Sequence, residues 1–100
     1  MKKSDNLQKI KTTVLPFARR YDLSFVGLFG SMARGDFTEK SDMDFLVEFC
    51  GPVTLPDVIG LEKEMSKKFK RKVDLVTEKA LNPRIRKFVF KDLKVIYEKK

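Results

Sequence analysis

The sequence predicts a small α/β (α+β) protein in which helices pack on a four-stranded sheet. Helix-like and strand-like segments alternate along the chain in the order α-β-α-β-α-β-α-β. The length of 100 residues is sufficient for one domain. Hydrophobic residues make up 42% of the chain and include nine Phe, which is enough for a core. We therefore expect a single domain over residues 1–100.

The first half of the chain begins with a predicted helix over residues 5–21, where apolar side chains recur at three- and four-residue steps. Pro16 lies inside this pattern, which leaves a kink or an early end of the helix open. A β-rich segment, 24–29, follows and is bounded by Gly30, which predicts the first strand. Residues 31–34 are then expected to form a short helical turn.

The second strand is expected over residues 43–49. Its alternating pattern places Asp44 on one face of the sheet and Phe45 on the other. Thr54, with Asp57 three residues later, is typical of a capping box and predicts the start of the next helix. An apolar stripe at helical spacing continues from this start.

The last part of the chain contains two further strands and one helix. The third strand is predicted over 72–77, and the fourth over 94–98. Between them, Asn82 and Pro83 are typical of a helix cap and a first helical turn.

Composition excludes several classes of site. The chain has no histidine, which excludes imidazole bases, Ser-His nucleophiles and the usual zinc sites. Cys50 is the single cysteine, so no intramolecular disulfide can form. No apolar run approaches the roughly 20 residues of a membrane span, and the N-terminus lacks the apolar stretch of a secretory signal. We expect a soluble, cytoplasmic protein whose chemistry depends on carboxylates and a hard metal ion.

The net charge of +8 is unevenly distributed. Residues 1–60 hold 8 Lys and Arg against 8 Asp and Glu, whereas residues 61–100 hold 14 against 6. One interpretation is a solvated, lysine-rich surface. The other is a docking surface for an acidic partner. The densest basic run comprises Lys67, Lys68, Lys70, Arg71 and Lys72.

The turn at Gly30 and Ser31 joins the end of a strand to a helical turn. Such a turn presents backbone N–H groups to an anion, and a glycine allows a phosphate to approach the backbone closely. Arg34 could add a positive charge. The alternative is an ordinary strand-to-helix turn with Ser31 as the N-cap residue.

Asp42 and Asp44 lie at the start of the second strand. Side chains two residues apart on a strand point to the same face, with Cα atoms about 6.6 Å apart, so both carboxylates could bind one divalent ion. The alternative is that Asp42 closes a turn and Asp44 faces solvent.

Asp74 strengthens the metal interpretation, because it lies mid-strand between Val73 and Leu75, where an unpaired buried acid would be costly. If the second and third strands are neighbours, three carboxylates gather at one place. Three acids, Mg²⁺ and an anion-binding turn are typical of two-metal phosphoryl or nucleotidyl transfer. The glycine-rich motifs GxxxxGK[ST] and GxGxxG are both absent.

Three stretches, GSMARGD (30–36), SDMDFLV (41–47) and VDLV (73–76), follow one another on the expected elements. With them the chain resembles the DNA polymerase β-like nucleotidyltransferase superfamily, and within it the minimal nucleotidyltransferases. The match runs from Phe25 to Val76, and segment 81–97 resembles the family's C-terminal helix and strand. The resemblance implies a single-domain nucleotidyltransferase fold with a mixed four-stranded sheet.

The resemblance also implies roles for the acids. Asp42 and Asp44 would bind Mg²⁺, and Asp74 would bind a second Mg²⁺ ion and help to activate the attacking hydroxyl. That hydroxyl would attack the α-phosphorus of a nucleoside triphosphate, most simply ATP, and pyrophosphate would leave. Asp42, Asp44 and Asp74 are thus the expected catalytic and metal-binding residues.

The same resemblance implies a nucleotide-binding turn. Gly30 and Ser31 would hold the β- and γ-phosphates. Arg34 would either orient a phosphate or brace the loop, and we slightly favour the bracing role.

The resemblance finally implies a partner. Many small members of the family act as antitoxins beside a HEPN-domain toxin, some by transferring AMP to a toxin tyrosine. We therefore expect a Mg²⁺-dependent protein adenylyltransferase that modifies a hydroxyl on a partner HEPN toxin. The alternative is a non-catalytic antitoxin that neutralises its toxin by binding. Direct binding to nucleic acid or to a membrane is not expected, and the sequence leaves a homodimer open.

Overall fold

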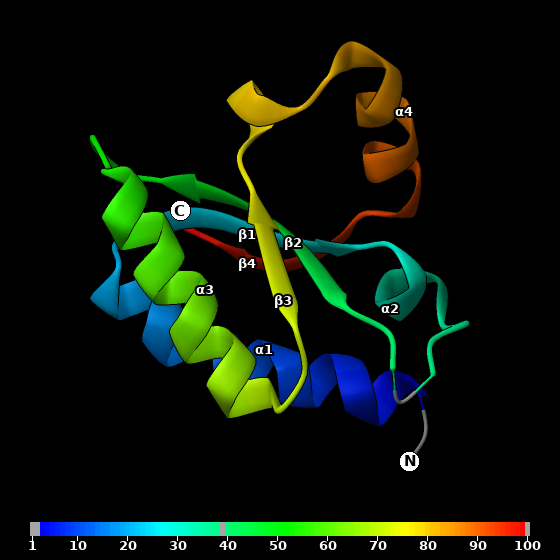
Figure 1. Ribbon diagram of the computed structural model, residues 1–100. Helices are drawn as coiled ribbons and strands as arrows, with labels where there is room; N and C mark the ends of the chain where they lie inside the picture. The colour runs from blue at the N-terminus through cyan, green and yellow to red at the C-terminus, as the bar shows by residue number, and fades with distance from the viewer. Residues whose placement is uncertain (1–2, 39, 100) are drawn as a thin grey trace.

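The computed structural model describes residues 3–38 and 40–99, so residues 1–2, 39 and 100 of the expected domain lie outside the described part. Helices and strands alternate there as the sequence predicts (Figure 1). The elements are α1 (Lys3–Arg20), β1 (Leu23–Phe29), α2 (Ser31–Arg34), β2 (Met43–Phe49), α3 (Leu55–Phe69), β3 (Val73–Val76), the 3₁₀ helix η1 (Glu78–Ala80), α4 (Pro83–Asp92) and β4 (Lys94–Glu98).

The four strands form one mixed sheet in the order β3-β2-β1-β4. β1 is antiparallel to both β2 and β4, whereas β2 and β3 are parallel. Parallel neighbours need a crossover connection, and α3 provides it. Helices α1 and α3 lie together against the sheet in Figure 1, while α4 lies apart from them. The expected mixed four-stranded sheet with helices is confirmed.

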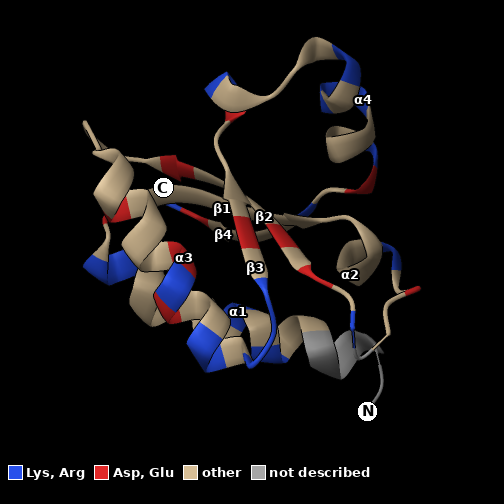
Figure 2. Cartoon of the chain, in the orientation of Figure 1, with Lys and Arg blue, Asp and Glu red and all other residues tan. Residues whose placement is uncertain are grey.

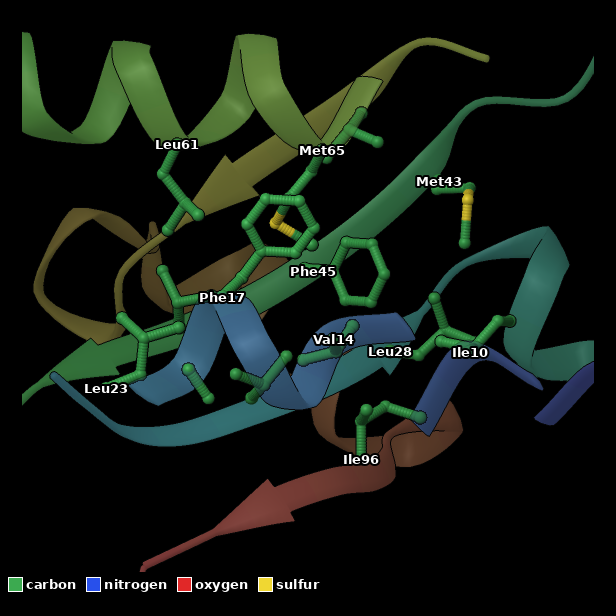
Figure 3. Packing of buried hydrophobic residues seen from close by; sticks show 14 residues of the cluster. Ile10, Val14, Phe17, Leu23, Leu28, Met43, Phe45, Leu61, Met65 and Ile96 are labelled. Carbon is green, nitrogen blue, oxygen red and sulfur yellow. The ribbon is translucent and has the colours of Figure 1, made fainter. Parts of the chain in front are cut away.

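The core lies between the sheet and helices α1 and α3 (Figure 3). Phe45 of β2 is fully buried there, and its ring centroid lies 6.0 Å from that of Phe69 on α3. Because side chains alternate along a strand, the burial of Phe45 on this face directs Asp44 to the opposite face. The buried cluster comprises Ile10, Val14, Phe17, Ala18, Leu23, Val26, Leu28, Met43, Phe45, Val47, Leu61, Met65, Val73 and Ile96.

Several local predictions can be compared with the observed elements. Pro16 neither ends α1 nor shortens it, since the helix continues to Arg20. The buried side chains on both sides of it, Val14 and Phe17, hold the last turns against the core. The predicted capping box is present, because the Thr54 hydroxyl accepts a hydrogen bond from the Asp57 backbone N–H and Asp57 accepts one in return. The 3₁₀ helix η1 was not predicted.

No helix within 3–38 and 40–99 combines the length and apolar character needed to cross a membrane.

Candidate active site

Asp44 and Asp74 lie directly opposite each other on the parallel strands β2 and β3. Figure 2 shows this as adjacent red bands on the two strands. Both side chains are partly buried, and both line an open groove of about 480 Å³. The groove is bordered on its other side by Ile85 and Val89 of α4. The second and third strands are therefore neighbours in the sheet, as expected, and their pairing brings two of the three acids together.

The electrostatics of this pair are unfavourable without a cation. Partial burial raises the pKa of Asp44, and the negative charges of Asp74 and Asp42 raise it further. Among the ion pairs of the described residues, none involves any of these three acids. Carboxylate oxygens without a protein cation are the ligands that Mg²⁺ prefers. The chemistry of these donors therefore fits a magnesium ion.

Asp42 lies in the loop immediately before β2, and it is exposed. Its negative charge contributes to the raised pKa of Asp44. In residues 3–38 and 40–99, however, no group of three acidic or cysteine side chains is arranged to hold a metal ion. Because the strand begins at Met43, the alternation of the strand does not fix the direction of Asp42 as it fixes that of Asp44. The structure thus presents a close pair of acids with a third acid nearby.

The glycine turn contacts this pair directly. Gly30 has a φ of 77°, which a side chain would strain, and a Cβ atom built there would lie 2.6 Å from Oδ2 of Asp44. A phosphate held at this turn would therefore lie beside a carboxylate. Two anions in contact repel each other unless a cation lies between them. The turn and the acids can consequently bind a phosphate together only when a cation is also bound.

The interpretation of Ser31 as the N-cap residue is wrong. Gly30 occupies that position, and Ser31 is the first residue of α2. The backbone N–H groups of Ala33 and Arg34 are already bonded to the Gly30 carbonyl. A glycine N-cap supplies no side-chain acceptor, so the hydroxyl of Ser31 is not used as a cap.

Arg34 braces the turn. Its Nε donates to Oδ2 of Asp36 at 3.2 Å, and its Nη1 donates to Oδ2 of Asp92 at 3.1 Å. Asp92 is the last residue of α4, so this ion pair links the glycine turn to the helix on the far side of the groove. Of the two roles predicted for Arg34, the contacts agree with bracing, while a direct role at a phosphate stays a prediction.

Arg71 holds the loop that leads to Asp42, a function that the sequence did not reveal. Its Nη1 donates to the carbonyl oxygens of Ser41 at 2.8 Å and of Thr38 at 3.0 Å. Ser41 immediately precedes Asp42, so the guanidinium fixes the backbone from which that acid projects. The sequence placed Arg71 in an exposed basic run, and only its being an arginine among lysines could have suggested a multidentate contact.

Helix α3 fixes the edge strand that carries Asp74. The backbone N–H of Val73 donates to Oγ of Ser66 at 3.0 Å, and that of Leu75 donates to Oε2 of Glu62 at 2.9 Å. These two bonds occupy donors on both sides of Asp74 in sequence, which positions its backbone and also protects the sheet edge. The sequence alone indicated no role for Glu62 or Ser66.

Comparisons with known proteins bear on the family and the fold. Residues 8–100 match the family model described as Polymerase beta, Nucleotidyltransferase. The Protein adenylyltransferase MntA of Thermococcus cleftensis is 35% identical over 74 residues, which cover 74% of this chain and 75% of the relative.

Two solved structures share the fold. A chain of a toxin–antitoxin structure with AMP-PNP superposes with a TM-score of 0.78 at 20% identity, over 90% of this chain and 74% of that one. A chain of the complex between the tri-AMPylated Shewanella oneidensis HEPN toxin and MNT antitoxin gives 0.72 at 18% identity, over 93% and 73%. At these identities the likeness shows the fold alone.

Proposed function

This chain belongs to the polymerase beta nucleotidyltransferase family, and we propose that it transfers AMP from ATP to a hydroxyl of a HEPN toxin, as the antitoxin of the pair. The observation that carries the proposal is the pair Asp44 and Asp74, in register beside the Gly30 turn. A relative named as a protein adenylyltransferase supports the reaction class. The complex of an AMPylated HEPN toxin with MNT antitoxin supports the acceptor. We further propose that residues 1–100 act as one minimal domain.

In this proposal Asp42, Asp44 and Asp74 hold Mg²⁺. When bound, the metal neutralises the acids and the phosphates and lowers the pKa of an acceptor hydroxyl. Gly30 lets the backbone approach the β- and γ-phosphates, and Ser31 contributes its hydroxyl as a donor. Two ions, as the family resemblance implies, would share the three carboxylates.

The chain's own residues then orient and activate the acceptor. The acceptor oxygen attacks the α-phosphorus in line with the bond to the bridging oxygen of the β-phosphate. That bond breaks and pyrophosphate leaves. The hydroxyl proton moves to a carboxylate oxygen of Asp74, whose backbone is fixed by the bonds from β3 to α3. The products are the adenylylated acceptor, pyrophosphate and one proton.

A second candidate function is favoured by two observations at the site. The exposed Asp42 and the absence, within the described part of the chain, of a three-acid metal group are compatible with a protein that binds its toxin without modifying it. In that case complex formation alone would neutralise the toxin.

One experiment separates these functions. The protein is incubated with ATP labelled at the α-phosphate, with Mg²⁺, and with the product of the gene adjacent to its own. Transfer predicts a labelled partner, and Asp44→Asn predicts an unlabelled one. A stable complex that never acquires label from the wild-type protein would contradict transfer and favour neutralisation by binding.

A further inference from the structure

Helix α4 exposes large apolar side chains to solvent. Val89 is its one buried residue, whereas Ile85 is 54% exposed and Phe88 is 70% exposed. Phe90 is also exposed, but the guanidinium of Arg86 lies over its ring at 5.4 Å from the centroid. Ile85 and Phe88, three residues apart, therefore form an uncovered apolar stripe along one side of the helix. Burial of such side chains against a partner is favourable.

This stripe continues into the groove of the candidate site. Ile85 lines the groove together with Val89, and on the other side of the same groove lie Asp44 and Asp74. Phe88 is not part of the groove lining and extends the apolar surface along the helix beyond the groove. A segment lying on Ile85 and Phe88 would thus have the reacting centre within reach of one of its side chains.

Basic residues border the stripe. Arg84, Lys87 and Lys91 recur at three- and four-residue steps, which places them on one face next to Phe88. All three are exposed, and none belongs to an ion pair recorded for residues 3–38 and 40–99. Figure 2 shows blue segments along α4. An acidic partner is the complement of this border.

The helix is also held in place at both ends. Asp92, at its C-terminus, pairs with Arg34 of the glycine turn. Arg86, in its first half, pairs with Glu78 of η1. A surface that is already fixed loses less conformational entropy when a partner binds.

We propose that α4 is the docking surface for the acceptor protein. The acceptor segment would place apolar side chains on Ile85 and Phe88 and acidic side chains against Arg84, Lys87 and Lys91, with its hydroxyl residue entering the groove. This inference rests on the proposed function and specifies the chemistry of its acceptor. It differs from docking at the basic run of residues 67–72, in which Arg71 binds the loop before Asp42.

The test uses two synthetic peptides of equal length. The first carries one tyrosine flanked by leucine and glutamate, and the second has lysine in place of every glutamate. Fluorescence anisotropy measures binding of each peptide, and mass spectrometry measures transfer of AMP to the peptides and to tyrosine amide. Tyrosine amide can enter the groove but is too small to extend to Phe88 and the basic residues that border it. The variants are Phe88→Ser and the double variant Lys87→Glu with Lys91→Glu.

Matched controls carry the same chemical changes elsewhere. Leu55→Ser changes an apolar residue that is 71% exposed on α3. The double variant Lys67→Glu with Lys68→Glu reverses two charges in the basic run. We expect each α4 variant to weaken binding of the acidic peptide about tenfold, with little change in the controls, and we expect the lysine peptide to bind weakly to all of them.

The outcomes separate the docking inference from the proposed function. If tyrosine amide is adenylylated but the α4 variants bind the acidic peptide as the wild type does, the docking surface is wrong and the transfer activity stands. If the charge reversal at Lys67 and Lys68 alone weakens binding, docking takes place at the basic run and the inference also fails. If binding depends on α4 while no acceptor is ever adenylylated, the docking surface stands and the proposed transfer fails.

Discussion

Asp44→Asn removes one of the two carboxylates that face each other across β2 and β3, and it preserves the size of the side chain. Strands lie about 5 Å apart, and two unit charges at that distance repel by about 3 kcal/mol at an effective dielectric constant of about 20. The groove is open, so solvent screening reduces this value to about 1 kcal/mol. Without divalent ions, Asp44→Asn should therefore raise the free energy of unfolding by about 1 kcal/mol at neutral pH, or Tm by about 4 °C.

The stability difference between Asp44→Asn and the wild type should depend on pH. The pKa of Asp44 is higher in the folded protein than its ordinary value, so the folded state binds the proton more tightly than the unfolded state does. The free energy of unfolding consequently falls as pH rises from the ordinary pKa through the raised one. The advantage of Asp44→Asn should be present above this window and absent below it.

Mg²⁺ should make the wild type more stable than Asp44→Asn, the reverse of the order expected without the ion. At about ten times its Kd, a ligand of the folded state stabilises it by about 1.4 kcal/mol. The wild type should gain this stability, whereas Asp44→Asn should gain little and should lose AMP transfer. Thermal unfolding followed at acid and neutral pH, with and without Mg²⁺, measures all of these effects. Glu98→Gln supplies a control with the same change in net charge at an exposed residue of β4 that belongs to none of the ion pairs of the described residues. A mutant that is less stable than the wild type without metal, or that gains equally from Mg²⁺, would refute the reasoning.

Three further substitutions test other parts of the site. Gly30→Val should abolish Mg²⁺-dependent nucleotide binding in calorimetry and cost about 1–3 kcal/mol of stability, since its Cβ would meet the Asp44 carboxylate at a φ of 77°; unchanged affinity would contradict the phosphate assignment. Asp74→Asn should keep the fold in circular dichroism and lose transfer, and wild-type transfer would remove Asp74 from the mechanism. Arg71→Met should weaken the stabilisation by Mg²⁺ several-fold, while Lys70→Met should not; equal behaviour would show that Arg71 does not position Asp42.

Local sequence patterns predict much of the fold and the face of the sheet on which Asp44 lies. The Thr54–Asp57 capping box marks the start of α3 because both hydrogen bonds are made within one turn. Alternation in β2 predicts that Asp44 and Phe45 point to opposite faces, and the burial of Phe45 shows this to be correct. Such predictions succeed because the physical cause lies within a few residues of its effect.

The contacts that complete the site join residues far apart in the sequence. Arg34 and Asp92 are separated by 58 residues, and Arg71 and Ser41 by 30. Arg71 occurs within a run of lysines and Arg34 two residues before Asp36, with no periodicity that distinguishes either arginine. Their partners are defined only when the strand order is known, and that order depends on the packing of the whole chain.

The parallel pairing of β2 and β3 is the part of that order which creates the site. Because β2 and β3 run in the same direction, their N-terminal ends lie side by side. The loop before β2 therefore meets the turn before β3. Arg71 can therefore reach the Ser41 carbonyl, and Asp74 can lie opposite Asp44. The crossover through α3 produces this arrangement, and the fully buried Leu61 and Met65 fix that helix on the sheet. The position of the acids thus depends on the packing of α3 as directly as on the strands that carry them.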